Sequence, residues 1–181
     1  MQDEESLVRR AQQHEQEAFA QLYERHFDKI YRYVVLRIGN ATEAEDLTQQ
    51  VFLNALKSIS SFKWKKIPFS AWLFRIAHNQ VVDHLRKRTK HLTDPLDDEA
   101  VVISNSNPQL EIELKLDIEQ VLSATQRLTA AQREVISLRF TSELPIAEVA
   151  RVMGKSEGAV KALQHSAIIA LRKALPVRDK I

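Results

Sequence analysis

The feature that most constrains the fold is a polar, acidic stretch in the middle of the chain, TKHLTDPLDDEAVVISNSNPQ (89–109). It mixes proline, asparagine, serine and four acidic residues with only a short apolar run, VVI, whereas both flanking parts carry apolar residues at helical spacing. Segments of this composition are typical of linkers between domains. We therefore predict two domains, at residues 1–92 and 112–181, joined by a flexible acidic linker at residues 93–111.

Both domains are predicted to be helical. The chain has only 3 glycines and 5 prolines in 181 residues, so it is poor in turn formers. Apolar residues recur every three or four positions, and no segment alternates as a strand would. The predicted fold class is all-α, with two small helical domains. In the first domain we expect two helices within residues 6–37, a break at Gly39 and Asn40, a third helix capped by Thr42, and a fourth capped by Ser70 that runs from about Ala71 to Arg88.

Charge is distributed unevenly along the chain. Residues 1–92 carry 15 basic and 11 acidic side chains, residues 93–113 carry 0 and 6, and residues 114–181 carry 11 and 7. Two basic units therefore flank an acidic connector. Basic surfaces attract polyanions such as nucleic acids, while an acidic linker is repelled by them.

The composition excludes several classes of site. There is no cysteine, which removes disulfides, thiolate metal sites and cysteine nucleophiles, and the 6 histidines show no paired ligand spacing such as H-E-x-x-H. We expect no metal and no cofactor. The polar, acidic start MQDEESLVRR is unlike a secretion signal, and no run of eighteen apolar residues exists. We expect a cytoplasmic protein without membrane insertion.

The sharpest motif lies in the C-terminal domain, in LPIAEVARVMGKSEGAVKALQ (144–164). Ala150, Gly154 and Val160 have the spacing of a helix-turn-helix, which needs a small residue where the helices cross, a glycine in the turn and a branched apolar residue that packs the helices together. Pro145 suits the first turn of the leading helix, and Ser156 can cap the second.

The second helix of this motif has a polar outer face. Val160, Leu163, Ala167 and Leu171 are expected to point inward. The outward residues are able to reach base edges and phosphates in a major groove; they are Glu157, Lys161, Gln164, His165 and Arg172. A helical hairpin with a solvated polar face is the alternative interpretation.

Aromatic and basic residues alternate in FKWKKIPFSAWLFRIAHNQ (62–80). Single-stranded nucleic acid binds such surfaces because rings stack on unpaired bases while cations neutralise phosphates. Between residues 63 and 90 a single acidic residue, Asp83, stands against eight basic ones, which are Lys63, Lys65, Lys66, Arg75, Arg86, Lys87, Arg88 and Lys90.

The rings of this stretch differ in their expected roles. Phe69 shares a helix face with apolar residues, and Phe62 closes the loop onto them, so we interpret both as core. Trp72 lies at the edge of that face, on a stripe that continues through Asn79 and Arg86, which favours contact with nucleic acid. Trp64 lies between lysines and fits either role.

The segment DLTQQVFLNAL (46–56) presents a mixed face to one side of its helix. Its inward positions are apolar, while the outer ones combine polar groups with one leucine: Asp46, Gln49, Gln50, Leu53 and Lys57. This face suits a partner helix, and an ordinary solvated face is the alternative.

Three segments together, AEDLTQQVFLNAL, PFSAWLFRIAHNQVVDHLRKR and LTAAQREVISLRF…LPIAEVARVMGKSEGAVKAL, closely resemble the extracytoplasmic-function (ECF) group of bacterial RNA polymerase sigma factors. The resemblance covers nearly the whole chain. It implies that the first domain binds core polymerase and melts the minus-ten element (sigma region 2). The second domain would read the minus-thirty-five element (sigma region 4).

The resemblance also implies site residues. Those for core polymerase, at the β′ clamp helices, are Asp46, Gln49, Gln50, Phe52 and Leu53. Those for the minus-ten strand are Lys63, Trp64, Lys65, Lys66, Trp72, Arg75, Asn79 and Arg86. Those for the minus-thirty-five groove are Ser156, Glu157, Lys161, Gln164, His165 and Arg172.

The implied protein is a transcription initiation factor without a catalytic site of its own. Its partners would be the β′ and β subunits of core RNA polymerase, promoter DNA and an anti-sigma factor. Two alternative functions are also compatible with the sequence. A sigma-like decoy would only sequester an anti-sigma factor, and a helix-turn-helix repressor would bind duplex operator without polymerase.

Overall fold

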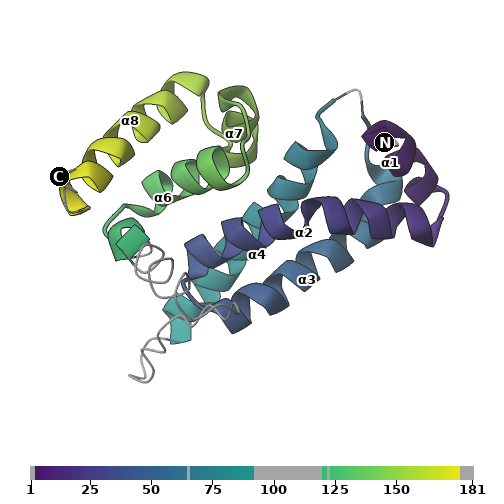
Figure 1. The fold of residues 1–181 in the computed structure, drawn as a ribbon, viewed down its shortest axis with the longest axis horizontal. Helices are drawn as coiled ribbons and strands as arrows, with labels where there is room; N and C mark the ends of the chain where they lie inside the picture. The colour runs from purple at the N-terminus through teal and green to yellow at the C-terminus, as the bar shows by residue number, and fades with distance from the viewer. Residues whose placement is uncertain (1–2, 65, 92–119, 122, 176–181) are drawn as a thin grey trace, which may run out of the picture.

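The computed structural model describes residues 3–64, 66–91, 120–121 and 123–175. The predicted linker at residues 93–111 lies outside these ranges. Within them, all regular secondary structure is helical, which confirms the all-α class (Figure 1).

The N-terminal unit is a bundle of four helices. Helices α1 (Glu4–Gln12), α2 (Gln16–Ile38) and α3 (Ala41–Ser58) are followed by a short 3₁₀ turn, η1 (Ile59–Ser61), and by α4 (Phe69–His91). Helix α2 packs against α1, α3 and α4. Their inward stripes meet in a common core, in which Leu22, Ile30 and Val51 are at most 1% exposed. The helical spacing of the sequence therefore predicts this core correctly.

Two helix starts differ from the sequence-based prediction. Gly39 ends α2 in the left-handed conformation at φ 74°, as expected for a glycine there. The N-cap of α3 is Asn40, whose side chain accepts a hydrogen bond from the Glu43 amide at 2.9 Å, so Thr42 lies inside the first turn and the prediction was wrong.

The start of α4 was also predicted too late. The helix begins at Phe69, because the Trp72 amide already donates to the Pro68 carbonyl at 3.1 Å. Ser70 is therefore a first-turn residue and not the cap. Proline just before a helix suits this place, since its fixed φ is compatible with the first turn and its missing N–H is not needed there.

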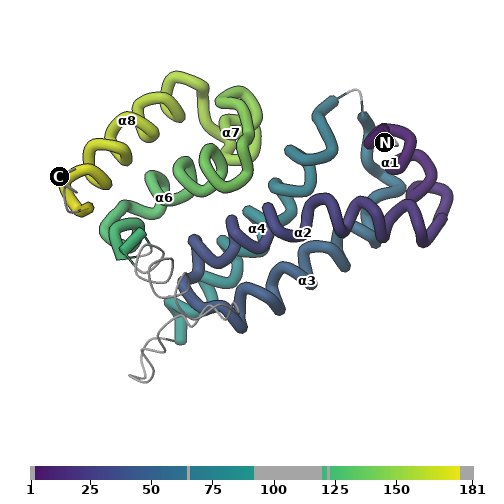
Figure 2. The backbone as a smooth tube through the Cα atoms, viewed as in Figure 1, coloured from purple at the N-terminus to yellow at the C-terminus, as the bar shows by residue number. Residues whose placement is uncertain are grey.

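The C-terminal unit is a smaller group of helices. Helix α6 (Ala130–Ile136) runs into a π-helical turn, η2 (Ser137–Thr141), and is followed by α7 (Ile146–Met153) and α8 (Glu157–Ala174). Thr129 and Gln132 cap α6 reciprocally through side chain and backbone. Helix α8 packs on α6 and α7, and in Figures 1 and 2 α6 lies between α8 and the N-terminal bundle.

The two units pack against each other in this structure. Helix α7 contacts α4, while α6 and η2 contact α2. Buried apolar residues of the C-terminal unit, among them Val135 and Leu138, belong to the same continuous core as those of the N-terminal bundle. The free chain is thus closed into one body.

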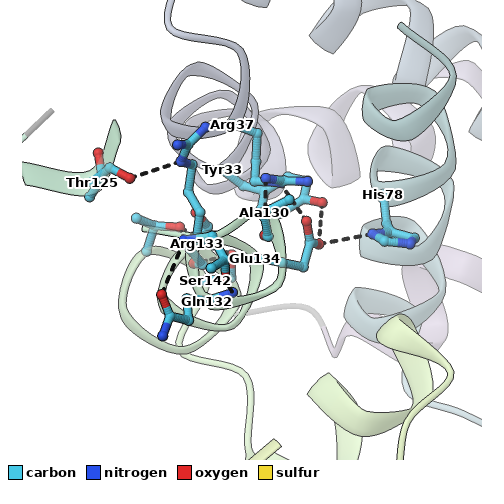
Figure 3. Close-up of polar contacts among 12 residues, drawn as sticks. Tyr33, Arg37, His78, Thr125, Ala130, Gln132, Arg133, Glu134 and Ser142 are labelled. Carbon is cyan, nitrogen blue, oxygen red and sulfur yellow. Dashed lines mark hydrogen bonds and ion pairs between the residues drawn. The ribbon is translucent and has the colours of Figure 1, made fainter. Parts of the chain in front are cut away.

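A buried polar cluster lies at this interface. Glu134 of α6 is 2% exposed, and its carboxylate meets Tyr33 and Arg37 of α2 and His78 of α4 (Figure 3). The Tyr33 hydroxyl donates at 2.5 Å, His78 Nδ1 lies at 2.9 Å, and Arg37 Nε forms an ion pair with Oε2 at 2.5 Å. These four residues, the Glu134 cluster, join three helices from both units.

Electrostatics keep the Glu134 carboxylate charged despite its burial. Burial alone would raise the pKa of Glu134, but the His78 hydrogen bond and the charge of Arg37 outweigh it, so that the pKa lies below its ordinary value. Burial and the neighbouring carboxylate raise the pKa of Tyr33 well above its ordinary value, so its hydroxyl remains a donor. The cluster is therefore a compensated buried charge rather than an isolated one.

We predict that Glu134→Gln weakens the docking of the two units by on the order of 3 kcal/mol, because it leaves the buried Arg37 guanidinium without a counter-ion. Urea unfolding of the whole chain measures this loss. The matched control is Glu143→Gln, which removes the exposed bridge to Lys29, and it should cost less than about 1 kcal/mol. Equal effects of the two substitutions would contradict the role given to the cluster.

Candidate nucleic-acid interface

Helix α3 presents a mixed polar and apolar face to solvent. Asp46, Gln49 and Gln50 are exposed, as predicted from the sequence. Leu53 is 50% exposed, and Leu56, one turn further, is 48% exposed. The sequence analysis missed Leu56, although its position three residues after Leu53 places both on one side of the helix. Two exposed leucines among polar groups suit a protein partner.

One residue assigned to this face from the resemblance does not lie on it. Phe52 is 4% exposed, and its ring packs against Tyr23 and Phe27 at centroid distances of 4.7 and 6.2 Å. The side chain of Phe52 therefore points into the bundle, whereas that of the next residue, Leu53, faces solvent. Phe52 therefore supports the α3 face from below and is not exposed for direct contact.

Phe62 and Phe69 form an aromatic floor between η1 and the start of α4. They are 6% and 1% exposed and meet edge to face at 5.6 Å, which confirms that both are core. Trp64 packs edge-on against Phe62 at 5.9 Å, and Trp72 contacts Phe62 at 5.1 Å and Phe69 at 5.5 Å. Both indoles are half-buried, so each rests on the floor with part of its surface open.

A stripe of polar and basic residues continues from Trp72 along α4. Arg75, Asn79 and Arg86 are all exposed, and their spacing of three, four and seven residues keeps them on one side of the helix. Arg86 donates to Asp83 at 3.0 Å in an exposed pair that nucleic acid could displace. Lys63 and Lys66 are exposed in the preceding loop, while Lys65 lies outside the described residues.

The structure confirms the helix-turn-helix in α7 and α8. Gly154 adopts φ 63° in the turn, Ser156 caps α8 by accepting from the Ala159 amide at 3.2 Å, and Val160 is fully buried. Pro145 is the N-cap residue of α7 rather than part of its first turn, because the helix begins at Ile146.

The outer face of α8 agrees with the sequence-based prediction in all but one residue. Ser156, Glu157, Lys161, His165 and Arg172 are exposed. Gln164 is half-buried and accepts a hydrogen bond from Arg139 Nε at 3.0 Å. Arg139 belongs to η2 and also donates to the Leu144 carbonyl at 2.6 Å, so it links α8 to the segment between η2 and α7. Because Arg139 lies outside α8, the residue spacing along α8 could not reveal its contact with Gln164.

Two further residue groups were not found from the sequence. Gln12 of α1 donates to the backbone of η1 and Phe62, and the Glu134 cluster joins the two units. Neither leaves a local pattern, because the partners are far apart in the chain.

Among the described residues, no group of three or more histidine, aspartate or glutamate side chains is placed to hold a metal ion. No helix in the described ranges has the length and apolar character needed to cross a membrane.

Known proteins resemble this chain in both parts. The family model for Sigma-70 region 2 matches residues 22–91, and that for Sigma-70, region 4 matches residues 124–173. The ECF RNA polymerase sigma factor SigW of Bacillus subtilis is 31% identical over 180 residues, covering 93% of this chain and 94% of that protein. The ECF RNA polymerase sigma factor BldN of Streptomyces coelicolor is 42% identical over 174 residues, but these are 94% of this chain and 65% of BldN.

Solved structures show the same arrangement of helices. The sigma factor RpoE from Bartonella quintana, in complex with the anti-sigma factor NepR, has a TM-score of 0.76 at 26% identity, over 88% of this chain and 98% of that one. CnrH, in complex with the cytosolic domain of CnrY, has a TM-score of 0.72 at 26% identity, over 92% of this chain and 93% of that one.

The turn of the helix-turn-helix offers a matched pair of substitutions. Apart from the adjacent residues and the local helix backbone, a methyl group on either Gly154 or Gly158 would meet no atom within 4 Å, but of these two only Gly154 has a positive φ. Gly154→Ala should therefore destabilise the chain by about 1 kcal/mol through backbone strain. Gly158→Ala should stabilise it by up to about 1 kcal/mol, since that glycine lies in a helix. Denaturant unfolding measures the free energy of unfolding of both variants. A change of the same sign in both variants would contradict this prediction.

Proposed function

The chain belongs to the ECF group of bacterial RNA polymerase sigma factors, and we propose that it binds core RNA polymerase, directs it to specific promoters and promotes DNA melting. The protein would supply binding energy and have no catalytic site of its own. It would work in the cytoplasm, where polymerase and promoter DNA are found.

The observation that carries the proposal is the pair of half-buried indoles on the aromatic floor, continued by the exposed stripe of α4. An unpaired base can stack on Trp72, while Arg75 and Arg86 are spaced to neutralise the phosphates that follow. Stacking of this kind contributes about 1–3 kcal/mol per base. Because duplex DNA does not offer the faces of its bases, such a surface favours the melted strand over the duplex.

The helix-turn-helix supplies the second contact with the promoter. Helix α8 is the recognition helix of the motif, and its exposed Glu157, Lys161 and His165 lie near its N-terminal half, the part that reaches base edges in this class of protein. Arg172, at the other end, suits a phosphate contact. We assign this surface to the duplex at the minus-thirty-five element.

The exposed face of α3 is proposed to bind the β′ clamp helices of the polymerase. Leu53 and Leu56 provide apolar area in its centre, and Asp46 and Gln49 provide polar contacts around it. The C-terminal unit is proposed to contact the β subunit. Phe52 contributes by fixing the position of α3 on the bundle rather than by contact.

The closed arrangement of the two units has to open for this function. The minus-ten and minus-thirty-five elements are separated by about 25 base pairs, or about 85 Å at 3.4 Å per base pair. A compact body of 181 residues has a radius of gyration of only about 16 Å. We infer that the interface around the Glu134 cluster separates when both elements are bound.

An anti-sigma factor is proposed as a further partner. The structures of RpoE and CnrH that resemble this chain each contain another protein, NepR and the cytosolic domain of CnrY. A protein that binds the closed form would prevent the separation that promoter binding needs.

The two rival functions are less consistent with the surfaces of the chain. A decoy that never engages promoters would not need an exposed recognition helix or the basic stripe on α4. A repressor that binds only duplex would not need two tryptophans on an aromatic floor in another domain.

One experiment separates these functions. Purified protein is added to core polymerase and a promoter library, and open complexes are mapped by the reactivity of thymines with permanganate. Reactive thymines that require both polymerase and this protein are expected. Bound duplex without reactive thymines would favour the repressor, and binding to an anti-sigma protein without binding to polymerase or DNA would favour the decoy.

Trp72 provides a narrower prediction on the same assay. Trp72→Ala should slow melting by about 5–150-fold, as loss of one stacked base implies, while core polymerase is bound as by the wild type. Trp72→Phe, which keeps a ring on the aromatic floor, should retain most of the melting. Equal losses of polymerase binding and melting in Trp72→Ala would refute the role of this residue.

A further inference from the structure

The side chain of Gln12 connects the N-terminal helix to the loop that carries the aromatic floor. Gln12 is the last residue of α1, and its Nε2 donates to two backbone carbonyls, that of Ile59 at 3.0 Å and that of Phe62 at 2.8 Å. Both partners are acceptors only, so the amide nitrogen, which carries two N–H groups, has to face them. Both of these donors are therefore used.

These two carbonyls bracket the turn η1 (Ile59–Ser61). On one side of η1 lies α3, with the proposed polymerase face, and on the other side begins the loop with Trp64. The Phe62 amide also donates to the Ile59 carbonyl at 3.0 Å, so the turn is closed by its own backbone and then fixed to α1 by Gln12. The path of the chain out of α3 is thereby defined.

Phe62 passes this constraint on to the proposed base-stacking site. Its ring contacts Trp64, Phe69 and Trp72 at centroid distances of 5.9, 5.6 and 5.1 Å. A shift of the Phe62 backbone would move the one ring that both tryptophans share as support. Gln12 itself lies under the loop and is not among the proposed DNA-binding residues.

The other end of α1 is fixed beneath the second ring of the floor. Glu4 Oε1 lies 2.7 Å from Nε2 of the buried His26, and the His26 ring packs edge-on against Phe69 at 5.5 Å. Leu7, Val8 and Ala11, between the two ends, are buried against the bundle. Helix α1 is thus linked to both phenylalanines of the aromatic floor: Gln12 binds the Phe62 backbone directly, and Glu4 reaches Phe69 through His26.

The turn after α1 holds Gln12 at its place. His14 adopts φ 64°, and the amides of Gln13 and His14 donate to the carbonyls of Arg10 and Ala11. The side chains of Arg10 and Glu15 pair across this turn. The helix end is therefore a defined structure and not a frayed one.

From these contacts we infer that Gln12 is a positioning residue for promoter melting: it fixes the backbone of Ile59 and Phe62 so that the aromatic floor presents Trp64 and Trp72 to unpaired bases. This inference rests on the proposed function of that surface. It extends the function to α1, none of whose residues is among those proposed to contact polymerase or DNA.

The test compares Gln12→Glu and Gln12→Met with Gln13→Glu and Gln13→Met. The carboxylate of Gln12→Glu has nearly the same shape but no donor, and it would face two carbonyl oxygens, while Gln12→Met removes the donors without adding charge. Gln13 is the exposed neighbour and receives the same chemical changes. Each variant is assembled with core polymerase, and polymerase binding and the rate of permanganate-detected melting are measured separately.

Tryptophan fluorescence gives a second readout that needs neither polymerase nor DNA. The chain has 2 tryptophans, and both rest on Phe62, so quenching by acrylamide reports directly on the floor. Quenching should increase in both Gln12 variants and stay unchanged in both Gln13 variants. Far-ultraviolet circular dichroism establishes that each chain is folded. If Gln12→Glu does not fold, the comparison is made with Gln12→Met.

We expect both Gln12 variants to bind polymerase like the wild type and to melt the promoter about tenfold more slowly, as the loss of one or two hydrogen bonds implies. Melting at the wild-type rate would overturn the inference and leave the proposed function intact. Equal losses of polymerase binding and melting would also overturn it, since Gln12 would then only support the fold. If the wild type itself produces no reactive thymines, the proposed function and the inference both fall.

Discussion

The ion pair between Arg37 and Glu134 is the interaction on which the arrangement of this molecule depends. Both residues are at most 5% exposed, and they lie on helices from different units. Such a pair is well suited to the proposed opening of this interface. The cost of removing both charges from water is recovered when they separate, so a buried pair adds specificity to the closed form with little net stability. The apolar contacts of α6 and α7 supply the attraction, and the Glu134 cluster fixes the register in which they dock.

Helix α4 makes contacts of three kinds on three different sides. Its inner side, with Phe69 and Leu73, completes the core of the N-terminal bundle, and His78 reaches the Glu134 cluster. The third side presents the exposed stripe that begins at Trp72. Because one rigid helix bears all three, the position of the proposed base-stacking site is tied both to the bundle and to the interface with the C-terminal unit.

Most of the fold could be predicted from local patterns in the sequence. Helical periodicity gave the bundle, and the spacing of Ala150, Gly154 and Val160 gave the helix-turn-helix, because both are determined by neighbours along the chain. The cap of α3 could not be predicted in this way, because Asn40 and Thr42 are both good N-cap residues and only the observed hydrogen bond distinguishes them. For Phe52, the family motif suggested a contact, while the packing against Tyr23 buries it.

Long-range polar contacts could not be predicted in the same way. Glu134 is separated from Tyr33 by 101 residues and from His78 by 56, and Gln12 from Phe62 by 50. No periodicity relates such positions. In the sequence each of these residues resembles an ordinary polar side chain at a helix surface. They become informative only when the helices are placed.

The proposed separation of the two units can be measured as a distance between them. The chain has no cysteine, so a double variant with Glu45→Cys on α3 and Lys173→Cys on α8, both exposed positions, can be labelled with a pair of fluorophores or spin labels. We predict a single short distance in the free protein. In the open promoter complex with core polymerase it should lengthen toward the roughly 85 Å between the two promoter elements. An unchanged short distance in a complex whose thymines react with permanganate would show that the promoter melts while the two units stay docked.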